Sequence, residues 1–308
     1  MEKRKISGLT AVWNEEATIA FTIGSLLPHV DHYVVVDSGS DDKTLEIIKK
    51  VFSKELESGK LHLIEYGKLE DYDISKPKNA AIEKIRELGC SHFIRLDADD
   101  VFFDRGAKKA VVAARELSEE VTLYTINHWE LYQNTAVTTS DWLEQLSTNE
   151  NWLCLRMPPG ANPTQSGYPH RFDGSYGHAR IYRTDGAVSR GKWTDEAWGL
   201  GPGEDIGHPG VRRVCIGNHD EDIVHYGWAR PMQKKLAKGA IWAREGEAHN
   251  ADPRIDRMEK LWENVGETNV GRTTYGIKYW PRNIVFPFTK HPEVIDRLLE
   301  SVKEIINA

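Results

Sequence analysis

Three carboxylates follow a strand-like run in the first third of the chain. Residues 93–96 suit a short β-strand, and Asp97, Asp99 and Asp100 come directly after it. Because like charges at this spacing repel one another, a bound cation would stabilise them. Divalent Mg2+ or Mn2+ prefers oxygen ligands, so this stretch is a candidate metal site. The competing interpretation, commoner for an isolated Asp-x-Asp, is that Asp99 or Asp100 caps a following helix.

The elements that must position these carboxylates alternate between strand and helix patterns. Apolar runs of strand length, separated by helical apolar spacing, occur at residues 6–12, 33–36, 61–64 and 93–96. This alternation predicts a parallel, doubly wound α/β sheet. Ligands of such sheets bind outside the carboxyl ends of the strands. The prediction therefore brings Asn14, Asp37 and Asp97 to one edge of the sheet.

The first strand–helix junction lacks the phosphate-binding signatures of other nucleotide enzymes. Residues 13–16 contain no Gly-x-Gly-x-x-Gly pattern, and the chain has no Gly-Lys-Ser/Thr loop. Asn14 also has a purely structural interpretation, as the N-cap of the next helix. A Rossmann dinucleotide site is therefore disfavoured, and a cleft lined by carboxylates is favoured.

Composition disfavours several classes of protein. The 308 residues carry 40 Lys and Arg against 47 Asp and Glu, a net charge of −7 without a basic footprint for nucleic acid. Three widely spaced cysteines predict neither a disulfide framework nor a zinc site, which fits a reducing compartment. With neither an apolar leader nor a membrane-spanning run, we expect a cytoplasmic protein, free or peripheral to a membrane.

Three motifs, taken in order, resemble the family 2 glycosyltransferases of GT-A fold. They lie at residues 12–16, 34–44 and 96–100, and they are nearest to the branch that contains bacterial lipopolysaccharide-core glycosyltransferases. The resemblance extends over residues 5–115, and more loosely over 178–240. It implies a GT-A (Rossmann-like), mostly parallel central sheet flanked by helices. It also implies metal-dependent, inverting transfer of a hexose or pentose from a nucleotide sugar, with a UDP-sugar favoured, to a hydroxyl acceptor.

The same resemblance implies roles for residues in both halves of the site. The donor-binding residues would be Val12, Asn14, Glu15, Asp37, Lys76, Asn79 and Asp97. Asp97 and Asp99 would hold Mn2+ or Mg2+, with His225 as a further metal ligand. Glu196, or Asp195 beside it, would be the general base that removes the proton of the acceptor hydroxyl.

The second half of the chain is less regular, and its organisation is predicted more coarsely. Residues 1–230 would form the catalytic domain, with a nucleotide-sugar half at 1–126 and an acceptor half at 127–230. Residues 231–308 would form a helical C-terminal extension. A polar insertion at 130–176 is expected to form long loops that set acceptor choice, with residues 162–167 as a flexible loop over the donor.

Two other functions remain open at this point. A sugar-phosphate nucleotidyltransferase combines a similar domain with acidic metal ligands, but it carries a glycine-rich phosphate loop that residues 13–16 lack. A non-catalytic sugar- or nucleotide-binding module would have little reason to keep together four acidic residues, Asp37, Asp97, Asp99 and Glu196. If neither Glu196 nor Asp195 is the base, Glu204 or Asp205 is the next candidate. The acceptor stays open among a glycan, a lipid-linked glycan, a protein, a small molecule and modified DNA, as does the oligomeric state.

Overall fold

The computed structural model describes residues 4–69, 73–116, 123–126, 128–133, 138–148, 153–156, 178–190, 197–199, 213–215, 223–227, 229–231, 233–234, 284–287 and 290–308. Among them, no helix combines the length and the apolar character needed to cross a membrane.

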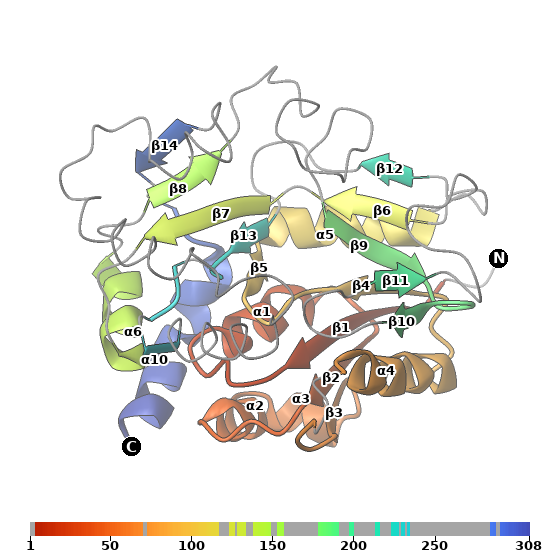
Figure 1. The fold of residues 1–308 in the computed structure, drawn as a ribbon, viewed down its shortest axis with the longest axis horizontal. Coiled ribbons are helices and arrows are strands. Elements are labelled where there is room, and N and C mark those ends of the chain that lie inside the picture. Colours follow the sequence, from red (N-terminus) through yellow and green to blue (C-terminus); the bar gives the residue numbers. More distant parts are fainter. Residues whose placement is uncertain are drawn as a thin grey trace, which may run out of the picture.

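A seven-stranded sheet, with the order β12-β6-β9-β4-β1-β2-β3, forms the centre of the fold (Figure 1). Its strands are β1 (Ile6–Val12), β2 (His32–Asp37), β3 (Leu61–Glu65), β4 (His92–Arg95), β6 (Leu123–Ile126), β9 (His178–Arg183) and β12 (Arg213–Cys215). Strands β3, β2, β1 and β4 pair in parallel, and β9 runs antiparallel to both β4 and β6. The predicted mostly parallel α/β sheet is confirmed.

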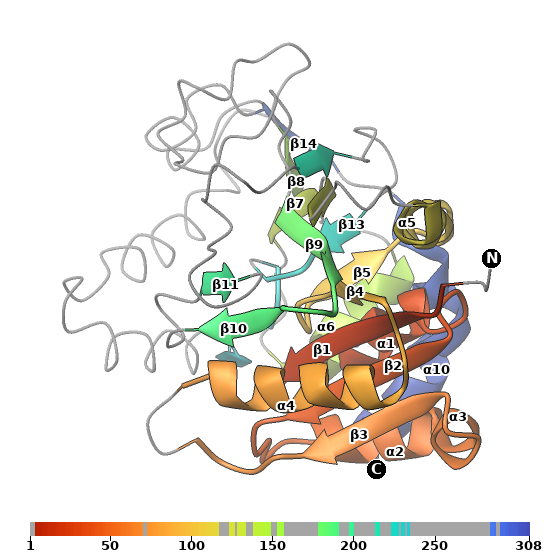
Figure 2. The ribbon, with the colours of Figure 1, turned by 90° about the vertical axis from the view of Figure 1, so that its right-hand side faces the viewer.

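Helices cover both faces of this sheet. Successive side chains of a strand point to opposite faces, so each face has its own hydrophobic core. In β2, Tyr33 and Val35 enter the larger core, whereas Val34 and Val36 enter a smaller core under α4. Figure 2 shows α4 running along β1 and β2. The helices near the sheet are α1 (Ile19–Leu26), α2 (Thr44–Val51), α3 (Ser53–Glu57), α4 (Ser75–Glu87) and α5 (Asp104–Glu116).

A second sheet joins the acidic stretch to the later part of the chain. Its order is β14-β8-β7-β13-β5, and the strands are β5 (Asp100–Phe102), β7 (His128–Gln133), β8 (Leu153–Arg156), β13 (Ile223–His225) and β14 (Ile284–Pro287). Strand β13 pairs antiparallel with β5, in a register that sets His225 opposite Asp100. A separate hairpin pairs β10 (Val188–Arg190) with β11 (Ala197–Gly199).

The expectation that residues 130–176 form long polar loops is wrong for part of that segment. It contains the end of β7, helix α6 (Thr139–Thr148) and β8. Trp142, Leu143 and Leu146 are buried in the main core, and they recur at the spacing of a helix face. Residues 162–167 lie outside the described residues, and a role of this segment in acceptor choice stays a prediction.

The last helix packs on the N-terminal half of the chain. Helix α10 (Glu293–Asn307) contacts α1, α2 and α6. Its buried side chains, all part of the main core, are Val294, Ile295, Leu299, Val302 and Ile305. The division into residues 1–230 and 231–308 stays a prediction, but the end of the second segment shares one core with the first.

Candidate active site

The carboxyl ends of β1, β2 and β4 lie at one edge of the sheet, because these strands are neighbours and parallel. Val12, the last residue of β1, pairs with Asp37, the last residue of β2. Asn14 and Asp97 each lie two residues beyond the end of a strand. The structure thus brings together the three strand ends that the alternation predicts.

Asn14 joins the loop after β1 to the loop after β2. Its amide donates to Asp41 Oδ1 at 2.6 Å and accepts from the Asp41 main-chain N–H at 2.9 Å. Its φ of +54° lies in the left-handed region, which asparagine tolerates better than most residues. The interpretation of Asn14 as a helix cap is wrong, because α1 begins at Ile19 with Thr18 at the N-cap position.

Asp37 shapes the turn after β2. Its carboxylate is buried and accepts hydrogen bonds from the N–H groups of Gly39 at 2.9 Å and Ser40 at 3.0 Å, and from the Ser40 hydroxyl at 2.5 Å. Gly39 has φ +83°, and a β-carbon there would meet the Lys68 main-chain nitrogen at 2.6 Å. The Asp37 carboxylate therefore fixes the shape of this turn. That Asp37 contacts the nucleotide stays a prediction.

Asp97 is the most exposed of the three carboxylates that follow β4, with 36% of its side chain accessible. It pairs with Arg95 at 2.5 Å and with Arg180 at 2.9 Å. Burial alone would raise the pKa of Asp97, but the guanidinium groups of Arg95 and Arg180 outweigh it and hold that pKa well below its usual range. Asp97 is therefore an ionised carboxylate that already has two cationic partners.

Asp99 and Asp100 lie deeper. Asp100 is fully buried and contacts Arg180 Nη2 at 2.6 Å and His225 Nδ1 at 2.9 Å, while Asp99 contacts Arg230. The helix-cap interpretation of these two residues is wrong, because Asp100 begins β5 and α5 starts only at Asp104. Strand pairing, not helix capping, fixes Asp100 beside His225.

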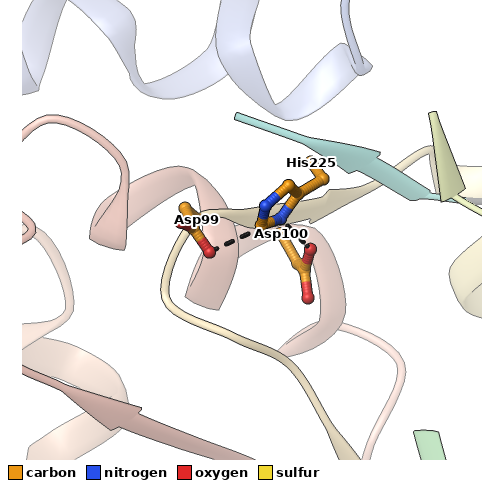
Figure 3. A group of neighbouring side chains, drawn as sticks. All are labelled: Asp99, Asp100 and His225. Atoms are coloured by element: carbon orange, nitrogen blue, oxygen red, sulfur yellow. Dashed lines mark hydrogen bonds and ion pairs between the residues drawn. The ribbon is translucent and has the colours of Figure 1, made fainter. Parts of the chain in front are cut away.

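Asp99, Asp100 and His225 form a group that could hold a metal ion (Figure 3). One ligand atom from each lies within 4.8 Å of the others, and His225 Nδ1 is 3.6 Å from Asp99 Oδ1. Two carboxylates and an imidazole suit Mn2+ better than Mg2+, so the donor set fits the predicted metal. The predicted ligands Asp99 and His225 belong to this group. Asp100, which the sequence analysis did not select, completes the group, and Asp97 as a metal ligand stays a prediction.

Gly227 leaves room for this arrangement. A β-carbon at that position would lie 2.2 Å from His225 Nε2 and 3.1 Å from Asp99 Oδ2. The distance of 2.2 Å is too short for unbonded atoms, so a side chain there would displace the imidazole. Glycine is required at position 227 because the His225 imidazole lies so close to its backbone, and not because of an unusual backbone angle.

The other predicted donor residues lie at different depths around this edge. Lys76 is exposed. The Asn79 side-chain amide donates to the Ser189 carbonyl in β10 at 3.0 Å and accepts from the Ser189 main-chain N–H at 2.8 Å. The buried Lys78, overlooked in the sequence, is the lysine whose charge lowers the pKa of Asp97.

Two more predicted donor residues are buried near the β1 end of the site. Val12 is buried, and its carbonyl accepts from the Ser38 N–H at 2.9 Å. Glu15 is also buried and accepts from Arg230 at 3.1 Å. Asp195 and Glu196 lie outside the described residues, immediately before β11.

Sequence reasoning missed two buried arginines, Arg180 and Arg230. Burial lowers the pKa of each guanidinium, but the neighbouring carboxylates raise it more, so both stay charged. Strand β9 skips Arg180 in its pairing with β6, and such bulges re-aim side chains near active sites. The excess of carboxylates at one strand end indicates that cations must lie nearby. It does not indicate which arginines supply them.

Comparison with known proteins gives the family. The family model of Glycosyl transferase family 2 matches residues 7–172, more than half of the chain. The structure of Staphylococcus aureus (S. aureus) TarS 1–349 in complex with UDP aligns with a TM-score of 0.42 at 17% identity, over 84% of this chain and 71% of that chain. Glucosyl-3-phosphoglycerate synthase from Mycobacterium tuberculosis, in complex with Mn2+, UDP-glucose and phosphoglyceric acid, aligns with a TM-score of 0.38 at 15% identity, over 96% and 91%. No curated protein matches. The protein belongs to glycosyl transferase family 2.

Proposed function

We propose that this glycosyltransferase moves a hexosyl or pentosyl unit from a UDP-sugar to a hydroxyl acceptor with the help of a divalent metal. The observation that carries the proposal is the group Asp99, Asp100 and His225 at the carboxyl edge of the sheet, in a chain of this family. Ligands of open α/β sheets bind at such an edge. The expectation that the transferred unit is hexosyl or pentosyl rests on the family resemblance alone.

On the donor side, Asp99, Asp100 and His225 would hold Mn2+ or Mg2+, with Asp97 beside them. The ion would supply positive charge that stabilises the leaving diphosphate. Around it, the donor-binding residues we propose are Val12, Asn14, Glu15, Asp37, Lys76, Asn79 and Asp97. Asn14 and Asp37 support this role because they shape the two loops that border the site.

On the acceptor side, Glu196 is the general base of a single inverting displacement, with Asp195 as the alternative. Glu196→Gln should leave the affinity for the donor unchanged and lower transfer by about a hundredfold to ten-thousandfold, because a positioned base acts only in the transition state. Asp195→Asn is the matched control and should cost much less. A crippling effect of Asp195→Asn alone would exchange the two roles.

The metal requirement is tested by calorimetric titration of UDP with and without Mn2+. Without the ion, we expect weak UDP binding, because the charges of Arg180 and Arg230 are already offset by Asp100 and Asp99 and attract the diphosphate little. Asp99→Asn should weaken Mn2+-dependent UDP binding with the fold intact, whereas Asp185→Asn, at an exposed ion pair with Arg183, should not. Equal UDP affinity of the wild type in both conditions would contradict the metal role.

The remaining assignments are proposals on the sequence pattern. They are kinship with the lipopolysaccharide-core branch, a cytoplasmic location and an acceptor among a glycan, a lipid-linked glycan, a protein, a small molecule and modified DNA. The nucleotidyltransferase alternative has no support in the described part of the chain. There, the junction between β1 and α1 is held by the Asn14 side chain and by the Glu15 main-chain N–H, which donates to the Thr44 hydroxyl at 2.9 Å, and not by a glycine-rich loop.

A further inference from the structure

Arg230 lies buried between two carboxylates that come from different loops. Its Nη1 is 3.1 Å from Glu15 Oε1, its Nη2 contacts Asp99 Oδ2, and its Nε donates to the Gly227 carbonyl at 2.9 Å. Glu15 and Asp99 are themselves buried. One guanidinium therefore neutralises a residue of the β1–α1 loop and a residue of the candidate metal group.

A second buried guanidinium serves the other carboxylate of that group. Arg180 contacts Asp100 at 2.6 Å and Asp97 at 2.9 Å. Both carboxylates that would bind a metal ion thus already have a cation within contact distance. Burying carboxylates without such partners would be strongly unfavourable, which explains why the arginines are there.

A divalent ion at Asp99 and Asp100 would place two further positive charges beside these guanidinium groups. At such short range and away from water, the repulsion between like charges is large. Once the ion is bound, the two arginines therefore cannot both keep their present contacts with Asp99 and Asp100. Either the ion binds weakly or one guanidinium withdraws.

Of the two arginines, Arg230 is the one able to withdraw. Arg180 is held in β9, inside the central sheet, and both of its partners belong to the acidic stretch. Arg230 follows β13, outside any strand, and would keep Glu15 and the Gly227 carbonyl after leaving Asp99. Lys234, bound to Asp42 at 2.5 Å and Glu16 at 3.2 Å, anchors the segment on its far side, so the change can stay local.

We propose that Arg230 is an exchangeable counter-ion that neutralises Asp99 in the metal-free protein and leaves Asp99, but not Glu15, when a divalent cation binds. The inference rests on the proposed metal-dependent function. It makes Arg230 a competitor of the metal and predicts that the ion alone binds weakly to the resting protein. Binding of a nucleotide, whose diphosphate adds negative charge, would favour the exchange.

The test is Mn2+ binding in the absence of nucleotide, followed by the electron paramagnetic resonance signal of the free ion. Arg230→Gln should bind Mn2+ about tenfold to a hundredfold more tightly than the wild type, because the competing charge is gone. Lys234→Gln removes a cation from the same segment without touching Asp99, and Arg115→Gln removes one from a distant pair with Asp31. Both controls should bind Mn2+ like the wild type.

A second variant guards against misfolding of Arg230→Gln, which leaves Glu15 and Asp99 without their cation. The double change Glu15→Gln with Arg230→Gln keeps the net charge of the wild type and should still bind Mn2+ more tightly. If the wild type binds Mn2+ with UDP but neither variant gains affinity without it, the exchange is overturned and the metal site stands. If the wild type binds no Mn2+ with or without UDP, the metal-dependent function fails, and the exchange fails with it.

Discussion

At the scale of single residues, Gly227 decides whether His225 can face the two aspartates. Because a β-carbon would lie 2.2 Å from His225 Nε2, Gly227→Ala should push the imidazole away from Asp99 and Asp100. We expect Mn2+ affinity in the presence of UDP to fall about tenfold to a hundredfold, the usual effect of disturbing the support of a metal ligand. Calorimetric titration measures this.

The matched control is Gly59→Ala, whose β-carbon would meet nothing within 4 Å. Gly59 has φ +70°, so alanine there should lower the melting temperature slightly while leaving Mn2+ affinity unchanged. Wild-type affinity in Gly227→Ala would show that His225 does not ligate the ion.

The residues of the site were only partly predictable. Asp99 and His225 were chosen from the sequence, and the structure brings them together. The sequence did not point to Asp100, which the structure sets beside Asp99 and His225 after a turn in which the Asp100 N–H bonds to the Asp97 carbonyl at 3.0 Å. Spacing along a strand does not reveal such a turn. The arginines lie far along the chain from their carboxylates, and tertiary pairing at that separation leaves no local pattern.

At the scale of elements, helix α1 holds the acidic stretch through hydroxyl groups. Thr18 and Thr22, one helical turn apart around the start of the helix, both donate to the Ala98 carbonyl at 2.9 Å. Further along, the Ser25 hydroxyl accepts from the Phe102 N–H at 3.1 Å. One face of α1 thus fixes the backbone on both sides of Asp99 and Asp100.

This doubling predicts a non-additive pair of mutations. Thr18→Val and Thr22→Val should each cost little, because the remaining hydroxyl still satisfies the Ala98 carbonyl. The double variant leaves that buried carbonyl without either donor, which should cost about 1–3 kcal/mol more than the sum of the single changes. Urea unfolding of all four proteins gives the coupling. Strict additivity would mean that the two hydroxyls do not share one role.

Elements were predicted well where a clear apolar pattern runs along the segment, and poorly where the segment carries no such pattern. Strand β1 has the bounds that the sequence indicates, and β3 ends one residue later than expected. Helix α6 was overlooked because its few buried residues lie within a polar stretch. The pairing of β13 with β5, which sets His225 beside Asp100, joins segments that carry no matching pattern.

At the scale of the whole molecule, the C-terminal helix connects the core to the site. Lys43 Nζ, in the loop after β2, donates to the carbonyls of Ile305 at 2.9 Å and Ile306 at 3.2 Å near the end of α10. Just before α10, His291 Nδ1 lies 2.7 Å from the hydroxyl of Tyr226, the residue after His225. Both ends of α10 are thereby tied to segments that border the candidate active site.

The predicted C-terminal extension should therefore not be separable from the catalytic domain. Each of the five buried apolar side chains of α10 contributes about 1.5–3 kcal/mol on burial. Their summed contribution is comparable to the whole free energy of unfolding of a typical domain, about 5–15 kcal/mol. Removing residues 290–308 should abolish cooperative melting. Within the full chain, Leu299→Ala should cost about 2–5 kcal/mol, whereas the exposed neighbour Glu300→Ala should stay within about 0.5 kcal/mol of the wild type. A shortened chain that melts cooperatively near the full-length temperature and still binds UDP would show instead that α10 is an addition to a core complete without it.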